Sequence, residues 1–165
     1  MISMRSLPLQ MIGLAAVTLL LSFAANALHP QGIEATRNYF AKPQHNFQTL
    51  SSEDFREYSA YPAAGEVDVV YLDARRRSLY ERGHVPGAWC VPRNDPAALE
   101  SALKAIEAAG MVVIYCQGGN CEDSIFTAED LVYRNGVDAS IVFIFEPGWD
   151  EWVKIKGPVR EGAER

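Results

Sequence analysis

Residues 112–124 read VVIYCQGGNCEDS, and this stretch decides the fold. A short apolar run that is continuous rather than alternating is typical of a strand buried on both faces of a sheet. The run ends at Tyr115, and Cys116 follows it directly. Gly118 and Gly119 predict a bend, and the polar residues around Asp123 predict the start of a helix. The segment therefore predicts a strand, a tight loop and a helix, with a cysteine at the carboxyl end of the strand.

The same alternation of strand and helix patterns continues on both sides of this segment. Strands that alternate with helices form a parallel sheet. We therefore expect an α/β fold in which a parallel central sheet is flanked by helices on both faces. Ligands bind such sheets beyond the carboxyl ends of the strands, which is where Asp73 and Cys116 lie. The expected strands are residues 67–72, 88–91, 111–115 and 140–145, and the expected helices are residues 52–58, 75–82, 96–109, 123–134 and 149–154.

The loop after Cys116 has the composition of an anion-binding cradle. Its glycines let the backbone curl so that several N–H groups point inward, and the helix that follows adds a partial positive charge. Both effects favour a thiolate over a thiol, and the thiolate is the nucleophilic form of cysteine. We therefore predict Cys116 as a nucleophile. The alternative is a small buried apolar residue at a strand end. The predicted anion-binding loop consists of Gln117, Gly118, Gly119, Asn120 and Cys121.

Composition narrows the classes of function. The chain has 165 residues, a formal net charge of −6 and no long basic run, so a nucleic-acid partner is disfavoured. The three cysteines are an odd number, which argues against a purely structural disulfide framework. The spacing of His84, Cys116 and Cys121 matches no familiar zinc pattern, so we expect no metal site.

The N-terminal part of the chain is apolar and separate from the domain. Residues 7–28 carry no formal charge, and such a length suffices to span a membrane. Two readings remain open: a membrane anchor, which we favour, or a signal peptide cleaved at the Ala25-Asn26-Ala27 motif. Because the lone preceding cation, Arg5, should stay cytoplasmic, we expect the domain outside the cytoplasm, in the periplasm if the source is bacterial. With signal cleavage the domain would instead be secreted. The expected organisation is an anchor or signal at residues 1–28, a linker at 29–46, a domain at 47–159 and a tail at 160–165.

Four short motifs follow one another in this chain. They are LDAR at residues 72–75, GHVPGA at 83–88, VIYC with Gly119 at 113–119, and PGW…W…GPV at 147–159. In the order and spacing of these motifs, the chain resembles the rhodanese family over residues 47–159. The resemblance implies a sulfurtransferase in which Cys116 accepts a sulfane sulfur as a persulfide. It also implies a small donor such as thiosulfate or a persulfide, a thiol or protein acceptor, and no metal or organic cofactor.

Three further residues of these motifs are expected to support the site. Asp73, at a strand end, organises the neighbouring loop, and Arg75 belongs to the same motif as Asp73. We expect His84 to stabilise a turn by hydrogen bonds rather than to act as a base.

Two departures from the family pattern affect the chemistry. The loop of the family commonly ends in arginine followed by serine or threonine, whereas here Cys121 occupies the arginine position and Glu122 and Asp123 precede Ser124. Without the cation, and with two carboxylates close by, we expect the pKa of Cys116 to be raised. Leu79 replaces an acidic residue of the family, so the usual partner of Arg75 is absent.

Cys121 itself is open to two interpretations. It is either a resolving thiol that attacks a persulfide on Cys116 or a small residue packed at the start of a helix. Two alternatives to sulfur transfer therefore remain: a thiol–disulfide redox module that uses Cys116 and Cys121, and a catalytically silent rhodanese binding module at the membrane.

Overall fold

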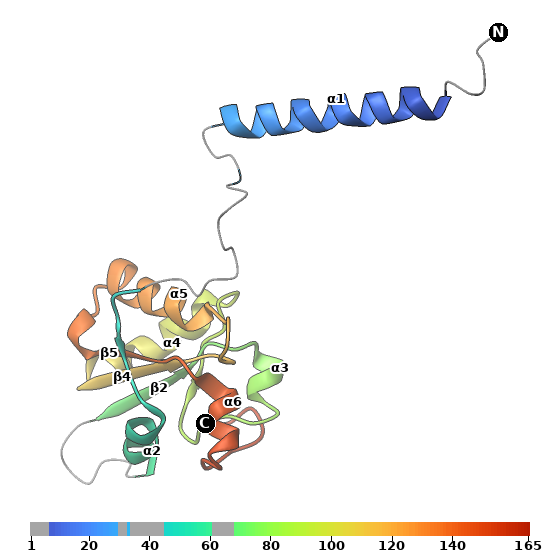
Figure 1. Ribbon diagram of the computed structural model, residues 1–165. Helices are drawn as coiled ribbons and strands as arrows, with labels where there is room; N and C mark the ends of the chain where they lie inside the picture. Colours follow the sequence, from blue (N-terminus) through green and yellow to red (C-terminus); the bar gives the residue numbers. More distant parts are fainter. Residues whose placement is uncertain (1–6, 30–32, 34–44, 61–67) are drawn as a thin grey trace. The chain divides into compact units, whose positions relative to one another are not determined.

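The computed structural model describes residues 7–29, 33, 45–60 and 68–165, and the chain divides into two units at Tyr39 and Phe40. Most of the expected linker, residues 29–46, lies outside the described residues. The first unit holds helix α1, Leu7–Leu28 (Figure 1). Its apolar side chains are solvent-exposed, with Met11, Leu14, Leu20 and Phe23 at 66–70%. A helix that is apolar on all sides suits a membrane rather than water. Residues 10–28 are long and apolar enough to span one, so α1 could be a membrane anchor or a signal sequence.

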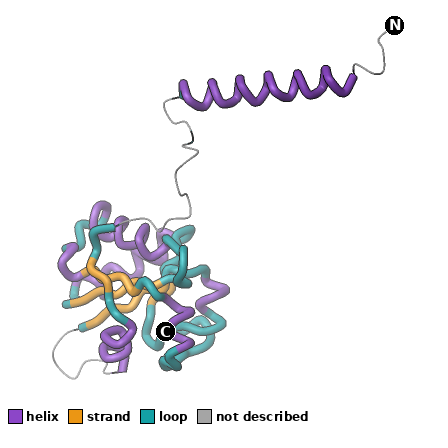
Figure 2. Tube along the Cα trace, in the orientation of Figure 1, coloured by secondary structure: helices purple, strands orange, loops and turns teal. Residues whose placement is uncertain are grey.

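The second unit is built around a parallel five-stranded sheet in the order β1-β5-β4-β2-β3. Figure 2 shows the strands between layers of helices. The expected α/β class with a parallel central sheet is therefore confirmed. The strands are β1 Gln48–Thr49, β2 Val69–Asp73, β3 Trp89–Cys90, β4 Met111–Tyr115 and β5 Val142–Phe145; the helices are α2 Ser52–Ala60, α3 Arg77–Tyr80, α4 Pro96–Glu107, α5 Asp123–Glu129 and α6 Gly148–Lys154, with a π-helical turn η1 at Asp130–Arg134 and a 3-10 turn η2 at Ala139–Ile141.

Two apolar clusters cover opposite faces of the sheet because side chains alternate along each strand. On one face, Val112 and Ile114 of β4 pack with residues of α4 and α5. On the other face, Val113 and Tyr115 pack with residues of α2, α3 and α6, among them the fully buried Trp152. The central strand β4 is thus buried on both sides, as its continuous apolar sequence predicts.

Local hydrogen bonds explain where the observed elements begin and end. The side chain of Asp95 accepts a hydrogen bond from the Ala98 amide and caps α4, and Ser51 caps α2 in the same way through the Asp54 amide. Strand β5 starts two residues later than expected, because the Asp138 carboxylate accepts the Ser140 amide and holds the intervening residues in a 3-10 turn.

Two expected helices differ from the structure, and one observed strand was not expected. The expected helix at 123–134 is α5 followed by the π-helical turn η1. The expected helix at 75–82 shrinks to α3, because Asp73 binds the amide and side chain of Arg75 and holds it outside the helix. Strand β1 was not predicted, since its two residues are exposed and lack an apolar pattern.

A buried ion pair joins the end of β2 to the turn that follows α3. Asp73 and Arg75 are 0% and 3% exposed, and the guanidinium of Arg75 donates to both carboxylate oxygens of Asp73. The same guanidinium donates to the Gly83 carbonyl at 2.7 Å and lies 4.2 Å from the centre of the Trp149 ring. Arg75 thus connects three segments at the carboxyl edge of the sheet.

We expect Arg75→Met to lower the free energy of unfolding by about 3–5 kcal/mol, because it leaves the Asp73 carboxylate buried without its counter-ion. Arg77→Met is the matched control, since its 3.5 Å pair with Asp95 is exposed and pairs of that kind contribute under about 1 kcal/mol. Urea unfolding of the two variants measures both values. Equal losses of stability would contradict the assigned role of Arg75.

Candidate active site

Cys116 follows β4 directly, and the chain then turns tightly before α5 begins at Asp123. The turn is closed by a hydrogen bond of 3.1 Å from the Cys121 amide to the Gly118 carbonyl. Gly118 has a φ of +102°, a conformation that residues with a side chain rarely adopt. The strand–loop–helix arrangement predicted from residues 112–124 is therefore present.

The start of α6 presses directly against this loop. A Cβ atom on Gly118 would lie 2.2 Å from the Pro147 carbonyl oxygen, and one on Gly148 would lie 2.6 Å from the Cys116 carbonyl oxygen. The amides of Trp149 and Asp150 donate to the carbonyls of Cys116 and Gln117 at 2.9 and 3.1 Å. The loop backbone is thus held by another element, and only glycine fits at either point of approach.

The Cys116 side chain packs in the apolar cluster on the α4 and α5 face of the sheet, and several hydrogen-bond donors contact its sulfur. The hydroxyl of Ser124 donates to Sγ at 3.4 Å, and the amides of Gly118 and Ser124 are also directed at the sulfur. One acceptor opposes them: the Cys121 carbonyl oxygen lies 3.3 Å from Sγ and would bind a protonated thiol. The donors outnumber this acceptor and therefore favour the thiolate.

These contacts correct the expectation that the pKa of Cys116 is raised. The Cys121 thiol is the largest influence, and together with Ser124 and the Gly118 and Ser124 amides it lowers the pKa of Cys116 to about 6, against the opposing effect of burial. The expectation was wrong because neutral donors take the place of the missing arginine. The Asp123 carboxylate contacts Cys121 rather than Cys116.

Cys121 is half-buried and is a free thiol, as are Cys116 and Cys90. Its Sγ lies 3.8 Å from Oδ2 of Asp123. The neighbouring Cys116 sulfur and burial both raise the pKa of Cys121, so this residue keeps its proton while Cys116 loses its own. Burial also raises the pKa of Cys90, to about 11, which makes that thiol a weak nucleophile.

The predicted loop residues do not all face the sulfur. Gly118 supplies an amide to it, whereas the Cys121 amide closes the turn and the Gln117 side chain donates to Asp150 at 2.5 Å. Ser124 supplies both an amide and a hydroxyl, although it was not among the predicted site residues. Because Glu122 and Asp123 separate Ser124 from the end of the loop, Ser124 does not fall on the position where the family pattern has its serine or threonine. Asn120 and Gly119 lie between these residues in the turn.

The predicted supporting residues lie beside the loop and organise its surroundings. Asp73 and Arg75 form the buried pair described above, and the adjacent Ala74 amide donates to the Tyr115 carbonyl, one residue before Cys116. Leu79 supplies no charge, and Asp73 is the carboxylate that pairs with Arg75.

His84 is fully buried and contacts the turn rather than the loop. Its ring stacks on Tyr80 at 3.7 Å between centroids, and its Nδ1 lies 2.9 Å from the Tyr80 carbonyl oxygen. Its backbone exchanges two hydrogen bonds with Arg160. All of these contacts suit a structural residue.

Two cavities flank the loop, and both have arginine in their walls. One of about 220 Å³ includes Gln117 together with Arg75 and Arg82. The other, of about 600 Å³, includes Asp123 together with Arg76 and Arg93. Cys116 itself is 2% exposed and lines neither of them. Cationic side chains from other segments therefore stand on both sides of a loop whose own sequence has none.

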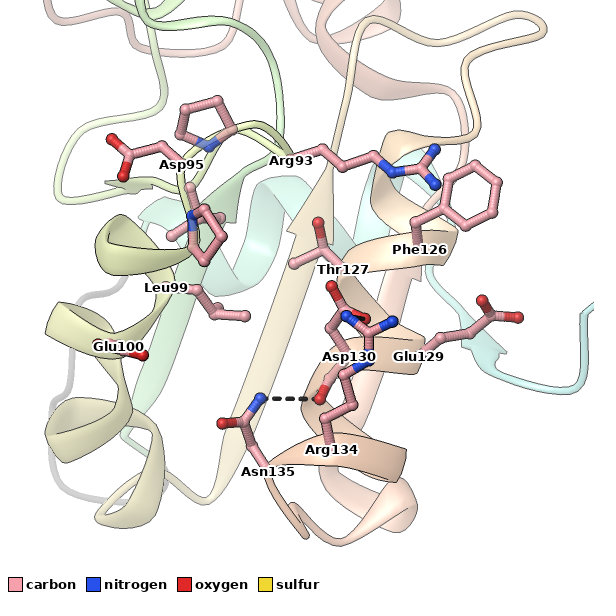
Figure 3. A pocket seen from close by; sticks show the side chains of 13 residues that line it. Arg93, Asp95, Leu99, Glu100, Phe126, Thr127, Glu129, Asp130, Arg134 and Asn135 are labelled. Atoms are coloured by element: carbon pink, nitrogen blue, oxygen red, sulfur yellow. Dashed lines mark hydrogen bonds and ion pairs between the residues drawn. The ribbon is translucent and has the colours of Figure 1, made fainter.

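A third cavity, of about 540 Å³, lies between α4 and α5 (Figure 3). The guanidinium of Arg93 lies 3.7 Å from the centre of the Phe126 ring at its upper end. Asp130 pairs with Arg134 at 3.1 Å and accepts the Asn135 side-chain amide through its carbonyl at 2.8 Å. Neither Cys116 nor Cys121 lines this cavity, so we assign it no part in the chemistry of the loop.

The described residues hold no group of three or more His, Cys, Asp and Glu side chains suited to a metal ion. A buried thiolate ringed by hydrogen-bond donors can attack a sulfur atom and then hold the anionic sulfur that it acquires.

We expect Ser124→Ala to raise the pKa of Cys116 by roughly one to two pH units, because a hydrogen bond to the charged sulfur is lost. Alkylation by iodoacetamide follows the thiolate fraction, so its rate should rise with pH around a midpoint near 6 in the wild type and at higher pH in the variant. Ser101→Ala, on exposed surface of α4, should leave the midpoint unchanged. Identical midpoints for wild type and Ser124→Ala would show that Ser124 does not stabilise the thiolate.

Comparisons with known proteins agree with this geometry. The model of the rhodanese-like domain family matches residues 55–155. No curated protein matches the chain. Among solved structures, the Alr3790 protein from Anabaena sp. is 23% identical with a TM-score of 0.53, and the match covers 67% of this chain and 78% of that one.

Two further solved structures show the same fold. The BH2092 protein from Bacillus halodurans is 18% identical with a TM-score of 0.55, and the match covers 70% of this chain and 78% of that one. A thiosulfate sulfurtransferase from Pseudomonas aeruginosa is 21% identical with a TM-score of 0.55, and the match covers 74% of this chain but 21% of that one. The family match spans most of the sheet and the whole cysteine loop, and the chain belongs to the rhodanese-like domain family.

Proposed function

We propose that this chain is a sulfurtransferase that carries a sulfane sulfur as a persulfide on Cys116. One observation carries the proposal: the Cys116 sulfur lies directly after the central strand β4 and accepts a hydrogen bond of 3.4 Å from the Ser124 hydroxyl. The Cys121 thiol, this hydroxyl and the amides of Gly118 and Ser124 lower the pKa of Cys116. In a rhodanese-like domain, a thiolate at the carboxyl end of the central strand is the group that can accept sulfur.

In the first step, the Cys116 thiolate attacks the outer sulfur of the donor. With thiosulfate, the sulfur–sulfur bond of the donor breaks, sulfite leaves with its electron pair, and Cys116 becomes a persulfide. The lowered pKa means that the nucleophile exists at neutral pH without a separate base. The same donors can then hold the anionic terminal sulfur of the product.

In the second step, a nucleophilic acceptor attacks the terminal sulfur. The new bond forms to the acceptor, the bond between the two sulfurs breaks, and Cys116 leaves as a thiolate. The contacts that lower the pKa of Cys116 also make it a good leaving group, since they stabilise the charge that it regains. A small thiol or a thiol on a protein is the acceptor that this chemistry suits.

The arginines in the cavities beside the loop support the proposal that the sulfur donor is an anion. Arg76 and Arg93 line the cavity that also contains Asp123, and among the described residues neither arginine has a carboxylate partner. Guanidinium groups suit sulfonate-like oxygens, which they bind through several N–H groups. Arg76 and Arg93 can therefore supply the positive charge that the arginine of the family's loop would provide.

We also propose that α1 stays attached and anchors the domain to a membrane, with the domain on the side away from the cytoplasm. The exposed apolar surface of α1 supports the membrane location, and the proposal for the side rests on the lone cation Arg5 that precedes the helix. Fractionation of cells that express the full chain should leave the protein in the membrane pellet after alkaline carbonate washing. Recovery in the soluble fraction, shortened near Ala27, would show a cleaved signal instead.

The wild-type protein should form thiocyanate from thiosulfate and cyanide, and Cys116→Ser should reduce the rate to that of the uncatalysed reaction. Cys90→Ser is the matched control and should keep full activity, because that thiol is protonated and lies on β3. A colorimetric thiocyanate assay measures all three. Full activity in Cys116→Ser would contradict the proposal, as would its absence from the wild type with both thiosulfate and a small persulfide as donor.

A further inference from the structure

Cys121 stands where the family pattern has an arginine, and the structure places it against the reactive sulfur. Its carbonyl oxygen lies 3.3 Å from the Cys116 Sγ, and its amide closes the four-residue turn that begins at Gly118. The α5 helix starts two residues later, and Cys121 is half-buried whereas Cys116 is buried. The loop therefore holds two thiols: Cys116 is the inner, buried thiol, and Cys121 is the outer, half-buried thiol.

A carboxylate stands beside the outer thiol. Oδ2 of Asp123 lies 3.8 Å from the Cys121 Sγ, and Asp123 also lines the cavity that contains Arg76 and Arg93. A carboxylate in this position can accept the proton of Cys121 as that thiol becomes a nucleophile. Glu122, the neighbouring carboxylate, is exposed. The two acidic residues thus differ in placement, although both interrupt the family pattern.

We propose that Cys121 resolves the persulfide on Cys116 and releases its outer sulfur as hydrosulfide. The inference rests on the proposed function, since it needs the Cys116 persulfide as its substrate. It adds a second activity to the loop: reduction of a sulfane sulfur to sulfide, with Cys116 and Cys121 as the electron source. The structure assigns Asp123 as the group that takes the Cys121 proton.

The step balances in atoms and electrons. The Cys121 sulfur attacks the Cys116 Sγ, a Cys116–Cys121 disulfide forms, and the bond to the outer sulfur breaks. Hydrosulfide leaves with that electron pair, and the proton of Cys121 passes through Asp123 to the departing sulfur. The two cysteines are oxidised, and the sulfane sulfur is reduced.

An external dithiol then completes the cycle. Thiol exchange at the outer, half-buried Cys121 sulfur would release Cys116 as a thiolate and oxidise the dithiol to a disulfide. The sum is one thiosulfate and one dithiol giving sulfite, hydrogen sulfide and one disulfide. The class of reductant is therefore a dithiol, small or carried on a protein.

Anaerobic treatment of the reduced chain with one equivalent of thiosulfate, followed by intact-mass analysis and a sulfide assay, tests the inference. The wild type should lose the mass of two hydrogens and release one equivalent of sulfide. Cys121→Ser should instead gain the mass of one sulfur atom and release none. Cys90→Ser should behave as the wild type, because Cys90 lies outside the loop.

The outcomes separate the inference from the proposed function. A wild type that keeps the added sulfur and forms no disulfide overturns the inference and leaves sulfur transfer intact. If neither the wild type nor Cys121→Ser gains sulfur or releases sulfide, sulfur transfer fails as well. A disulfide that needs Cys90 also overturns the assignment of Cys121.

Asp123→Asn measures the assigned role of the carboxylate. In a single turnover it should slow sulfide release more than sulfite release, because only the second step uses the carboxylate as a proton acceptor. Glu122→Gln is the matched control and should change neither rate. Slowing of both steps to the same extent in Asp123→Asn would show a structural effect instead.

Discussion

The close approach of two backbone segments holds the reactive loop in shape. Gly118 and Gly148 stand so near each other's chains that a side chain on either would collide with a carbonyl or an amide. Hydrogen bonds from the start of α6 to the Cys116 and Gln117 carbonyls complete the contact. Because the loop is braced from outside, its Gly118 amide can point at the Cys116 sulfur rather than at a strand neighbour. The shape of the loop around Cys116 therefore depends on a helix that is distant in the sequence.

Loss of the loop arginine changes how the site handles charge. In this chain neutral donors stabilise the sulfur, and the guanidinium groups that line the nearby cavities come from the segments after β2 and β3. Stabilisation of the thiolate and attraction of an anionic donor are thereby assigned to different residues. The position that the arginine leaves is occupied by a second thiol, Cys121, with the Asp123 carboxylate beside it. This second thiol is the basis of our proposal that the loop both receives sulfur and reduces it, a step for which an arginine at that position could not supply the thiol.

Much of this could be predicted from the sequence, and the failures have identifiable physical causes. The continuous apolar run of β4 predicted the central strand, and the glycines after Cys116 predicted the loop, because both signals are local. The role of Gly148 depends on a contact across the fold, and no local pattern reports such a contact. The pKa of Cys116 was predicted with the wrong sign, since counting nearby formal charges ignores the direction of amides and of the Ser124 hydroxyl. The short strand β1 was missed because its residues are exposed and carry no periodic signal.

The central claim is that the loop donors hold an anionic sulfur attached to Cys116. A crystal structure of the Cys121→Ser variant after thiosulfate treatment tests it most directly, because that variant has no resolving thiol. We expect electron density for one added sulfur on Cys116, within hydrogen-bonding distance of the amide nitrogens of Gly118 and Ser124. An added sulfur directed away from both amides, or bound to another residue while Cys116 stays unmodified, would contradict the account.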